Sequence, residues 1–316
     1  MTVLCWALAA PGLAWAAVRL GGVEVGPLVQ LLAFTPYAAA WSPVPAGLAL
    51  GLRRWWPAAA AGLASAALLT CVLPGWVGDG GGAGRDVGGG PVVRVLSVNL
   101  LEVGGSPEAV LALVRDRRVD VLAVQELSPE TLAALDRLGL RSLLAHRSAG
   151  PAYGSAGSGV FSRFPLASAG VRRNPSGMRQ AYATVLVAGA SPVLVESVHS
   201  CSPYALRQVR CWRADLAAQP AATPDGQVRL LTGDFNATLD HAAMRRILGT
   251  GYRDAAAAVG QGLAGTWGPY DGDPIPPVTI DHVLVDRRVG VRSVSVHGIP
   301  GSDHRAVLAE LSLPPA

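Results

Sequence analysis

Apolar residues fill the first part of the chain in long uncharged stretches that have no polar face. The stretches run from residue 2 to 18, from 25 to 52 and from 55 to about 77. Each is close to or above the roughly 20 residues that a helix needs to cross a bilayer. The pattern therefore predicts a transmembrane segment of about three helices over residues 1–77. A cleaved signal peptide is the alternative interpretation of the first stretch, although that stretch lacks a basic N-terminal region.

The few charges in this segment predict its orientation. Arg53 and Arg54 lie in the short connection between the second and third stretches, whereas Arg19 alone follows the first. Basic residues favour the cytoplasmic side, so three crossings would carry everything after residue 77 out of the cytoplasm. We therefore expect a multi-pass protein of the cell membrane, with the residues after 77 outside the cytoplasm.

The pattern changes after a glycine-rich linker over residues 78–90, and residues 91–316 read as a separate folded domain. Apolar runs of strand length, as in residues 92–100, 119–124 and 193–199, alternate with helical spacing. Residues 107–117 read as a helix with Ser106 as its N-cap. The alternation of strands and helices is typical of a compact α/β domain.

One stretch, LLTGDFNATLDH from residue 230 to 241, combines a buried strand with polar residues. Asp234 and Asn236 are two positions apart, so both side chains can project from the same side of the chain. A carboxylate beside a carboxamide suits phosphate-ester hydrolysis, because the acid fixes water or metal and the amide donates to a phosphoryl oxygen. An Asx turn without chemistry is the alternative. Thr238 or Asp240 is expected to cap the following helix.

Polar residues recur at the ends of the predicted strands, where loops on a rigid scaffold usually carry function. A single glutamate or histidine at such a place is more often structural than catalytic. Eight of them together are harder to explain without chemistry. They are Asn99, Glu126, His199, Asp234, Asn236, Asp281, Asp303 and His304.

The composition of the chain limits which classes of function fit it. The chain has 316 residues, half of them hydrophobic, and its 26 basic residues are all arginine. Setting aside the four arginines and three acids before Pro91 leaves a net charge of +3, which is not the dense basic surface of a dedicated duplex-DNA binder. Cys201 and Cys211 are ten residues apart and either form a disulfide in an oxidising compartment or remain two buried thiols. No feature indicates an obligate protein partner.

Seven fragments occur in the order of a known family: SVNL, VQEL, SGVFSRFPL, VHSCSP, GDFNA, TIDHV and GSDHRAV. Together they resemble the endonuclease/exonuclease/phosphatase superfamily, which has the fold of pancreatic deoxyribonuclease. The resemblance covers about residues 92–313. Combined with the apolar N-terminal segment, it makes the chain similar to a membrane-anchored bacterial member of that superfamily.

The resemblance implies a four-layer α/β sandwich in which two facing, mostly antiparallel sheets lie between outer helices. It also implies hydrolysis of phosphate esters with a divalent metal, usually Mg²⁺, with Mn²⁺ as the alternative. Glu126 matches the metal-binding glutamate of the family, Asn99 the asparagine beside it, and Asp303 a further carboxylate near the metal.

The remaining matches imply catalytic roles. His304 matches the histidine that activates water or binds the phosphate, and Asp281 matches the aspartate that holds this histidine. Asp234 and Asn236 match the pair that positions the nucleophile and the phosphoryl oxygens. His199 matches a second phosphate-facing histidine. His282, adjacent to Asp281 on a strand, is expected to point away from the site.

These features together predict a membrane-anchored, Mg²⁺-dependent phosphoesterase whose catalytic domain, residues 91–316, lies outside the cytoplasm. Its substrate is either nucleic acid, as for an extracellular nuclease, or a phospholipid head group, as for a sphingomyelinase-like lipid phosphodiesterase. The loop over residues 265–277, with Trp267 and Tyr270, is the candidate apolar rim for a lipid. A non-catalytic binding module of the same fold is a further alternative, which loss of the metal-binding glutamate or the histidine base would favour. Neither is lost.

Overall fold

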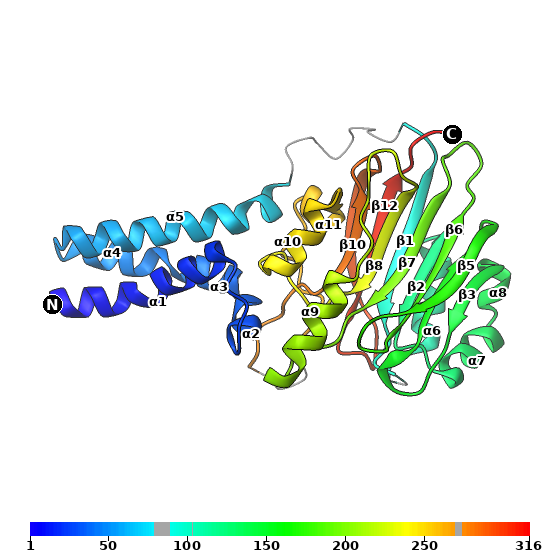
Figure 1. The fold of residues 1–316 in the computed structure, drawn as a ribbon, viewed down its shortest axis with the longest axis horizontal. Coiled ribbons are helices and arrows are strands. Elements are labelled where there is room, and N and C mark those ends of the chain that lie inside the picture. Colours follow the sequence, from blue (N-terminus) through cyan, green and yellow to red (C-terminus); the bar gives the residue numbers. More distant parts are fainter. Residues whose placement is uncertain (79–88, 103, 269–273) are drawn as a thin grey trace.

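A computed structural model describes residues 1–78, 89–102, 104–268 and 274–316. A helical arm, residues 1–77, projects from one side of a sandwich of two β-sheets (Figure 1). Most of the glycine-rich linker lies outside the described residues.

The helical arm contains two helices that are long and apolar enough to cross a membrane, α1 (Thr2–Gly21) and α5 (Trp55–Val77). The expectation of about three membrane helices is wrong in this respect. Three short helices, α2 (Leu28–Leu32), α3 (Thr35–Trp41) and α4 (Pro43–Gly51), take the place of the second span in this described segment.

Prolines account for the interruption. Pro36 and Pro43 lie in the first turns of α3 and α4, where a missing N–H costs nothing, but neither residue can continue a preceding helix. Ser42 Oγ donates instead to the carbonyl of Ala39, at 2.8 Å. A sequence that is uniformly apolar is therefore not uniformly helical.

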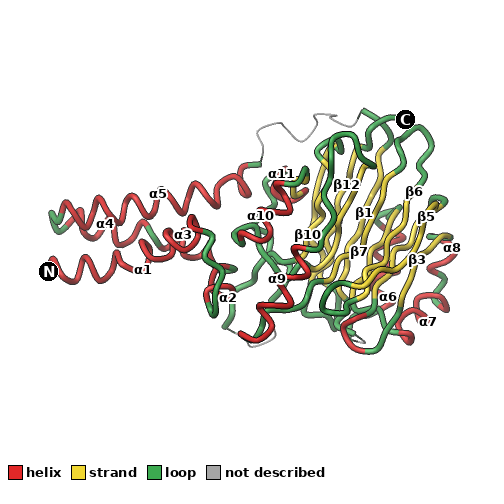
Figure 2. The backbone as a smooth tube through the Cα atoms, viewed as in Figure 1, coloured by secondary structure: helices red, strands yellow, loops and turns green. Residues whose placement is uncertain are grey.

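Two mixed six-stranded sheets face each other in the described part of the catalytic region (Figure 2). Each has one parallel pair at its centre, and its other pairings are antiparallel. The first sheet has the order β11 (Gly290–Gly298), β12 (Arg305–Ser312), β1 (Val92–Asn99), β2 (Val121–Gln125), β4 (Ser158–Ser162) and β3 (His146–Gly150). The second has the order β5 (Leu166–Arg173), β6 (Arg179–Val185), β7 (Val193–His199), β8 (Val228–Asp234), β10 (Asp281–Asp286) and β9 (Tyr252–Asp254).

Helices cover the outer faces of both sheets and complete the four layers. Over the first sheet lie α6 (Pro107–Asp116), α7 (Pro129–Arg137) and α8 (Leu140–Leu143); over the second lie α9 (Val209–Ala217) and α10 (Ala242–Gly249). The short helix α11 (Ala255–Ala258) packs against strands of both sheets, β11 and β10. Short 3₁₀ turns occur at Gly154–Ala156 and Leu206–Gln208. Valines and alanines such as Val95, Ala183 and Val283 form the core between the sheets. The expected α/β sandwich is confirmed.

The central parallel pairs determine where polar strand ends meet. In the first sheet, Asn99 is in register with Gln125, the residue before Glu126. In the second, His199 and Asp281 both pair with Asp234, from opposite sides of β8. Because the two sheets face each other, these ends converge at one edge of the sandwich.

Candidate active site

Asp234 ends β8 at a point where two backbones approach closely. The preceding Gly233 has φ of 150°, and a Cβ atom on it would lie 2.0 Å from the carbonyl oxygen of Val198 on β7. Only glycine fits this approach, and it holds β8 tightly against β7. In the sequence pair Gly233-Asp234, the glycine is therefore required for packing, and the aspartate directly after it supplies a buried carboxylate.

The carboxylate of Asp234 is the centre of a polar network. Its Oδ2 atom accepts from Nδ2 of Asn99 and from Nδ2 of Asn236, each at 3.1 Å. Its Oδ1 atom accepts from the backbone N–H of Asn236, at 2.8 Å. Nε2 of His199 lies 3.5 Å from Oδ2. Asp234 is only 1% exposed, so these groups replace water as its environment.

Glu126 lies on the other side of Asn99, at the end of β2. Its Oε1 atom accepts from Nδ2 of Asn99 at 3.1 Å, and its Oε2 atom accepts from the backbone N–H of Glu102 at 3.0 Å. Nε2 of His199 is 3.7 Å from Oε1, while Nδ1 of His199 faces the carbonyl of Ser155 at 3.0 Å. Asn99 and His199 thus bridge the carboxylates of Glu126 and Asp234.

Two site residues hold left-handed backbone conformations that are uncommon outside glycine. Glu126 has φ of 57° and Asn236 has φ of 50°. Such conformations cost about 1–3 kcal/mol for a residue with a side chain and tend to cluster at functional sites. Both residues follow directly or closely on a strand end, where the turn directs the side chain into the pocket.

Asp281 and His304 form the second half of the site. Nδ1 of His304 lies 2.9 Å from Oδ2 of Asp281, and both residues are buried. Nε2 of His304 is left to face Oδ2 of Asp234, at 3.8 Å, and Oδ1 of Asp303, at 3.9 Å. The backbone N–H of Asp281 donates to Oγ1 of Thr266.

Asp303 is oriented by an aromatic side chain that sequence reasoning assigned elsewhere. Nε1 of Trp267 donates to Oδ2 of Asp303 at 2.9 Å, so Trp267 belongs to the site rather than to an exposed rim. Tyr270, the other residue of that predicted rim, lies outside the described residues. Ser302 connects the two halves of the site, because its Oγ donates to the carbonyl of Asn99 and accepts from the N–H of His304.

All eight residues singled out at strand ends therefore meet in one contiguous network. His282 does not belong to it. Its Nδ1 faces Oδ2 of Asp254 and its Nε2 faces the carbonyl of Ala237, each at 2.8 Å, on the opposite side of β10. The expected helix cap at Thr238 or Asp240 is wrong: the N-cap of α10 is His241, without a side-chain cap bond. Asp240 instead pairs with Arg19.

Burial shapes the electrostatics of the site. Burial raises the pKa of Asp234 to about 6; the charge of Asp281 adds to this, and the charges of His304 and His199 oppose it. Burial lowers the pKa of His304, but the carboxylates of Asp281, Asp234 and Asp303 outweigh it and raise that pKa to about 10. The site thus strongly favours positive charge.

The donor set fits a divalent cation. Four carboxylates (Glu126, Asp234, Asp281 and Asp303) are collected with two histidines, so an excess of negative charge remains even when both imidazoles are protonated. Such a concentration of buried charge requires a compensating cation. Oxygen donors match the preference of Mg²⁺. Asp234, Asp281 and His304 also present atoms within 4.8 Å of one another.

A pocket of about 580 Å³ opens over these residues, and part of its lining was not anticipated from the sequence. Four residues of the helical arm, Val29, Gln30, Ala33 and Phe34, lie along it together with Glu126, His199, Asp234 and His304. Nothing in their apolar sequence context distinguishes them from neighbouring residues of a membrane span. Thr266 and Trp267 were missed as site residues for a similar reason, because they lie in a loop without a strand pattern.

Comparisons with known proteins agree with this geometry. Residues 96–304 match the family model described as Endonuclease/Exonuclease/phosphatase family. A search of curated proteins found no significant match. Among solved structures, an endonuclease/exonuclease/phosphatase from Beutenbergia cavernae is 19% identical with a TM-score of 0.58, covering 71% of this chain and 72% of that one. D. rerio TDP2 complexed with single-strand DNA product is 17% identical with a TM-score of 0.53, covering 70% and 98%.

These structural similarities support the fold alone, since the identities are low. The family match covers well over half of the chain and includes all eight network residues. The chain therefore belongs to the Endonuclease/Exonuclease/phosphatase family.

Proposed function

We propose that this protein is a metal-dependent phosphoesterase that hydrolyses phosphodiester or phosphomonoester bonds by attack of water. The observation that carries the proposal is the convergence of Glu126 and the Asp281–His304 pair on the buried carboxylate of Asp234, inside one pocket. Membership of the family is consistent with hydrolase chemistry of this kind.

Glu126, Asn99 and Asp303 would hold the metal, Mg²⁺ or alternatively Mn²⁺. When bound, the cation supplies Lewis-acid stabilisation of the negative charge on the phosphoryl oxygens. Among the described residues, Oδ1 of Asn99 accepts from the N–H of Leu101, at 3.0 Å, and a second lone pair on that oxygen can serve a ligand.

The residues of the chain itself orient the reaction. Asp281 holds Nδ1 of His304, so Nε2 is presented to the reacting atoms. The imidazolium form, which the raised pKa favours, donates to a phosphoryl oxygen, and the neutral form accepts a proton from water. Asp234 positions the attacking water. Asn236 and His199 face the phosphoryl oxygens, and both are fixed by backbone partners, Ser200 for Asn236 and Ser155 for His199.

We further propose that the protein is anchored in the cell membrane with its catalytic domain outside the cytoplasm. Helices α1 and α5 have suitable length and composition. The turn between α4 and α5, which carries Arg53 and Arg54, lies at the end of the helical arm remote from the sheets (Figure 1). The Cys201–Cys211 disulfide, with Cα atoms 5.8 Å apart, favours an oxidising compartment.

The substrate class has two candidates. A single-strand DNA product is bound by the D. rerio relative, which makes nucleic acid a reasonable substrate for this chain also. The described residues that line the pocket include no arginine, however, and arginine or lysine contacts to phosphates dominate nucleic-acid affinity. This feature favours a phosphoester with a smaller charged part. A non-catalytic module is the least supported candidate, because the network residues are all retained.

One assay tests the proposal. Full-length protein in detergent is incubated with bis(p-nitrophenyl) phosphate, DNA, RNA and phospholipid in the presence of Mg²⁺, Mn²⁺ or EDTA. Hydrolysis of at least one substrate that EDTA abolishes supports the proposal. Absence of hydrolysis with every metal and substrate, by protein that retains its fold, contradicts it.

A further inference from the structure

The helical arm does more than extend from the catalytic domain, because its α2–α3 region reaches the active-site pocket. Val29, Gln30, Ala33 and Phe34 line that pocket together with residues of the acidic network. Val29 is 1% exposed and packs in the same apolar cluster as Phe235, the residue after Asp234. These four residues are therefore one wall of the site; we refer to Val29, Gln30, Ala33 and Phe34 as the arm wall.

Specific polar contacts hold the arm wall in place. Nε2 of His241 donates to the carbonyl of Val29 at 2.8 Å, because Nδ1 of the same ring accepts from the N–H of Thr238. Gln30 donates to the carbonyl of Pro203. Nε of Arg19 lies 2.5 Å from Oδ1 of Asp240, and both side chains are 9% exposed. The arm is thus docked by directional bonds, not only by apolar contact.

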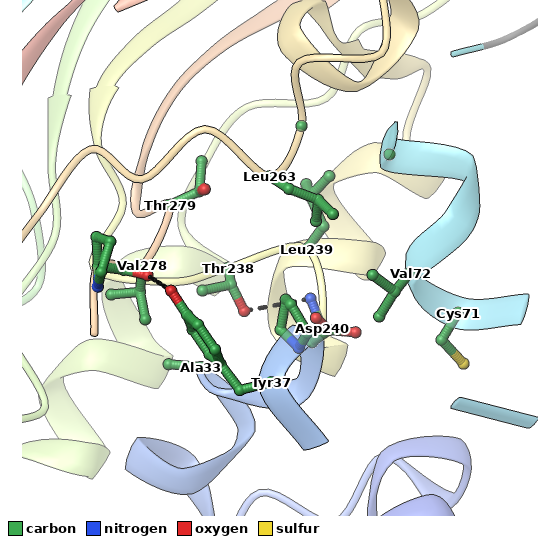
Figure 3. A pocket seen from close by; sticks show the side chains of 14 residues that line it. Ala33, Tyr37, Cys71, Val72, Thr238, Leu239, Asp240, Leu263, Val278 and Thr279 are labelled. Atoms are coloured by element: carbon green, nitrogen blue, oxygen red, sulfur yellow. Dashed lines mark hydrogen bonds between the residues drawn. The ribbon is translucent and has the colours of Figure 1, made fainter. Parts of the chain in front are cut away.

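A second set of contacts lies behind the arm wall. Figure 3 shows Tyr37 and Val72 of the arm facing Thr238, Leu239 and Asp240 around a small cavity of about 60 Å³. The hydroxyl of Tyr37 donates to the carbonyl of Pro277 at 2.6 Å. The segment that carries Asp234 and Asn236 therefore contacts the arm through Thr238, Leu239 and Asp240. The same segment supports both the site residues and the arm wall.

The pocket lining combines two kinds of side chain. Glu126, His199, Asp234 and His304 supply the polar part, against which a phosphate group fits. Phe34 and Ala33 of the arm supply apolar surface, together with Val278 and Met178 of the sandwich. A volume of about 580 Å³ accommodates a phosphate ester together with an attached organic group. An apolar group that packs on the apolar part gains hydrophobic free energy that a sugar or a second phosphate would not.

We propose that the arm wall is a specificity determinant of the active site, and that it selects phosphodiesters that carry a hydrocarbon group. The phosphate lies against the acidic network and the hydrocarbon group lies against Phe34 and Ala33. This inference rests on the proposed phosphoesterase function. It assigns the α2–α3 region a part in substrate binding that anchoring alone does not require.

Two water-soluble phosphodiesters with the same leaving group test the inference: methyl p-nitrophenyl phosphate and hexyl p-nitrophenyl phosphate. In each, water attacks phosphorus, the bond from phosphorus to the phenolic oxygen breaks, p-nitrophenolate leaves, and an alkyl phosphate and a proton remain. Full-length protein in phosphatidylcholine nanodiscs is assayed with Mg²⁺. We expect kcat/KM to be at least ~10-fold higher for the hexyl ester, since burial of about two methylene groups is sufficient for that ratio.

Variants of the arm assign the effect to its residues. Phe34→Ala should lower the hexyl-to-methyl ratio about tenfold. Leu31→Ala is the matched control: Leu31 is 45% exposed in the same region and does not line the pocket, so its variant should keep the wild-type ratio. Both variants are compared on the same substrates, so partitioning of the hexyl ester into lipid cancels.

The outcomes separate this inference from the function beneath it. Similar kcat/KM values for the two esters would contradict the proposed role of the arm wall in specificity. So would a hexyl-to-methyl ratio that Phe34→Ala leaves unchanged, or that Leu31→Ala lowers to the same extent. Each of these outcomes leaves the proposed phosphoesterase function standing. Absence of Mg²⁺-dependent hydrolysis of either ester contradicts the proposed function itself, and the inference with it.

Discussion

Nδ1 of His304 lies 2.9 Å from Oδ2 of Asp281, across the gap between the two sheets, and both groups are buried. An imidazole held in this way has one defined orientation, with Nε2 toward Asp234. Asp281→Asn and His304→Ala are each expected to lower kcat by roughly 10²–10⁴-fold, because each removes the same oriented group. The double variant should lose far less than the product of the two losses. Fully multiplicative losses in a steady-state assay would separate the two residues.

The neighbouring His282 provides the matched control for that experiment. It is fully enclosed on the other side of β10, hydrogen-bonded to Asp254 and to the carbonyl of Ala237. His282→Gln should therefore leave kcat of the folded enzyme within a few-fold of wild type. A loss of kcat equal to that of His304→Ala, in protein that remains folded, would mean that the wrong histidine has been assigned.

Stability should respond differently at His282. Both of its ring nitrogens face acceptors, so the ring is a buried cation. Burial lowers the pKa of His282, but the hydrogen bond and charge of Asp254 outweigh burial and raise it. Because the folded pKa is raised, the stabilisation is complete below the unfolded pKa of about 6.5 and is lost as the pH rises through the folded value. His282→Gln should cost about 3 kcal/mol at pH 6 and progressively less in alkali, measured as a melting temperature against pH. A cost that grows with pH would contradict the assignment.

The buried pair between Arg19 and Asp240 predicts how firmly the arm is docked. Removing one member leaves an uncompensated buried charge, so Arg19→Met should lower stability by about 3–5 kcal/mol. The control pair is Arg115–Asp116, whose side chains are 65% and 63% exposed; Arg115→Met should change stability by at most about 0.5 kcal/mol. Thermal unfolding of both variants in the same detergent measures the difference. Equal small effects would indicate that the arm is not held by this pair.

Membrane topology is tested independently of activity. An alkaline phosphatase fused at Gly84 should be active, because that enzyme requires the oxidising exterior, and a fluorescent protein that folds only in the cytoplasm should be dark. An inactive phosphatase with a bright fluorescent fusion would place the catalytic domain in the cytoplasm. It would also make the Cys201–Cys211 disulfide unexpected there.

The extent to which the sequence could predict this structure depended on burial. Strands such as β1, β7 and β8 are continuous apolar runs, since both faces are covered, and their bounds were close to those observed. Three edge strands, β3, β5 and β9, were missed. β5 is half exposed along its length and reads LASAGVRR, without a clear alternation. An edge strand is partly exposed to solvent, so it can fold with few apolar residues. Its pattern of apolar and polar positions is therefore weak.

Some residues of the site could likewise be identified from the sequence pattern, and others could not. Residues at the ends of core strands, such as Asn99, Asp234 and Asp281, could be found because a polar residue after an apolar run is conspicuous. The arm wall could not. Its docking uses the backbone carbonyls of Val29, Pro203 and Pro277 as acceptors, and a carbonyl has the same chemistry in every residue. Apolar lining residues inside an apolar segment leave no pattern that separates them from their neighbours.

The central claim is that a divalent cation held by Glu126 is required for phosphate-ester hydrolysis. Full-length wild-type protein and Glu126→Gln are titrated with Mg²⁺ from a chelated state, and hydrolysis of bis(p-nitrophenyl) phosphate is followed at each concentration. Glutamine keeps the size of the side chain but removes a hard anionic ligand. We expect the wild type to show a saturable rise in rate, and Glu126→Gln to fall at least ~100-fold in kcat/KM and to need a higher Mg²⁺ concentration, with an unchanged melting temperature. A Glu126→Gln variant with the wild-type rate and the same Mg²⁺ dependence would contradict the account.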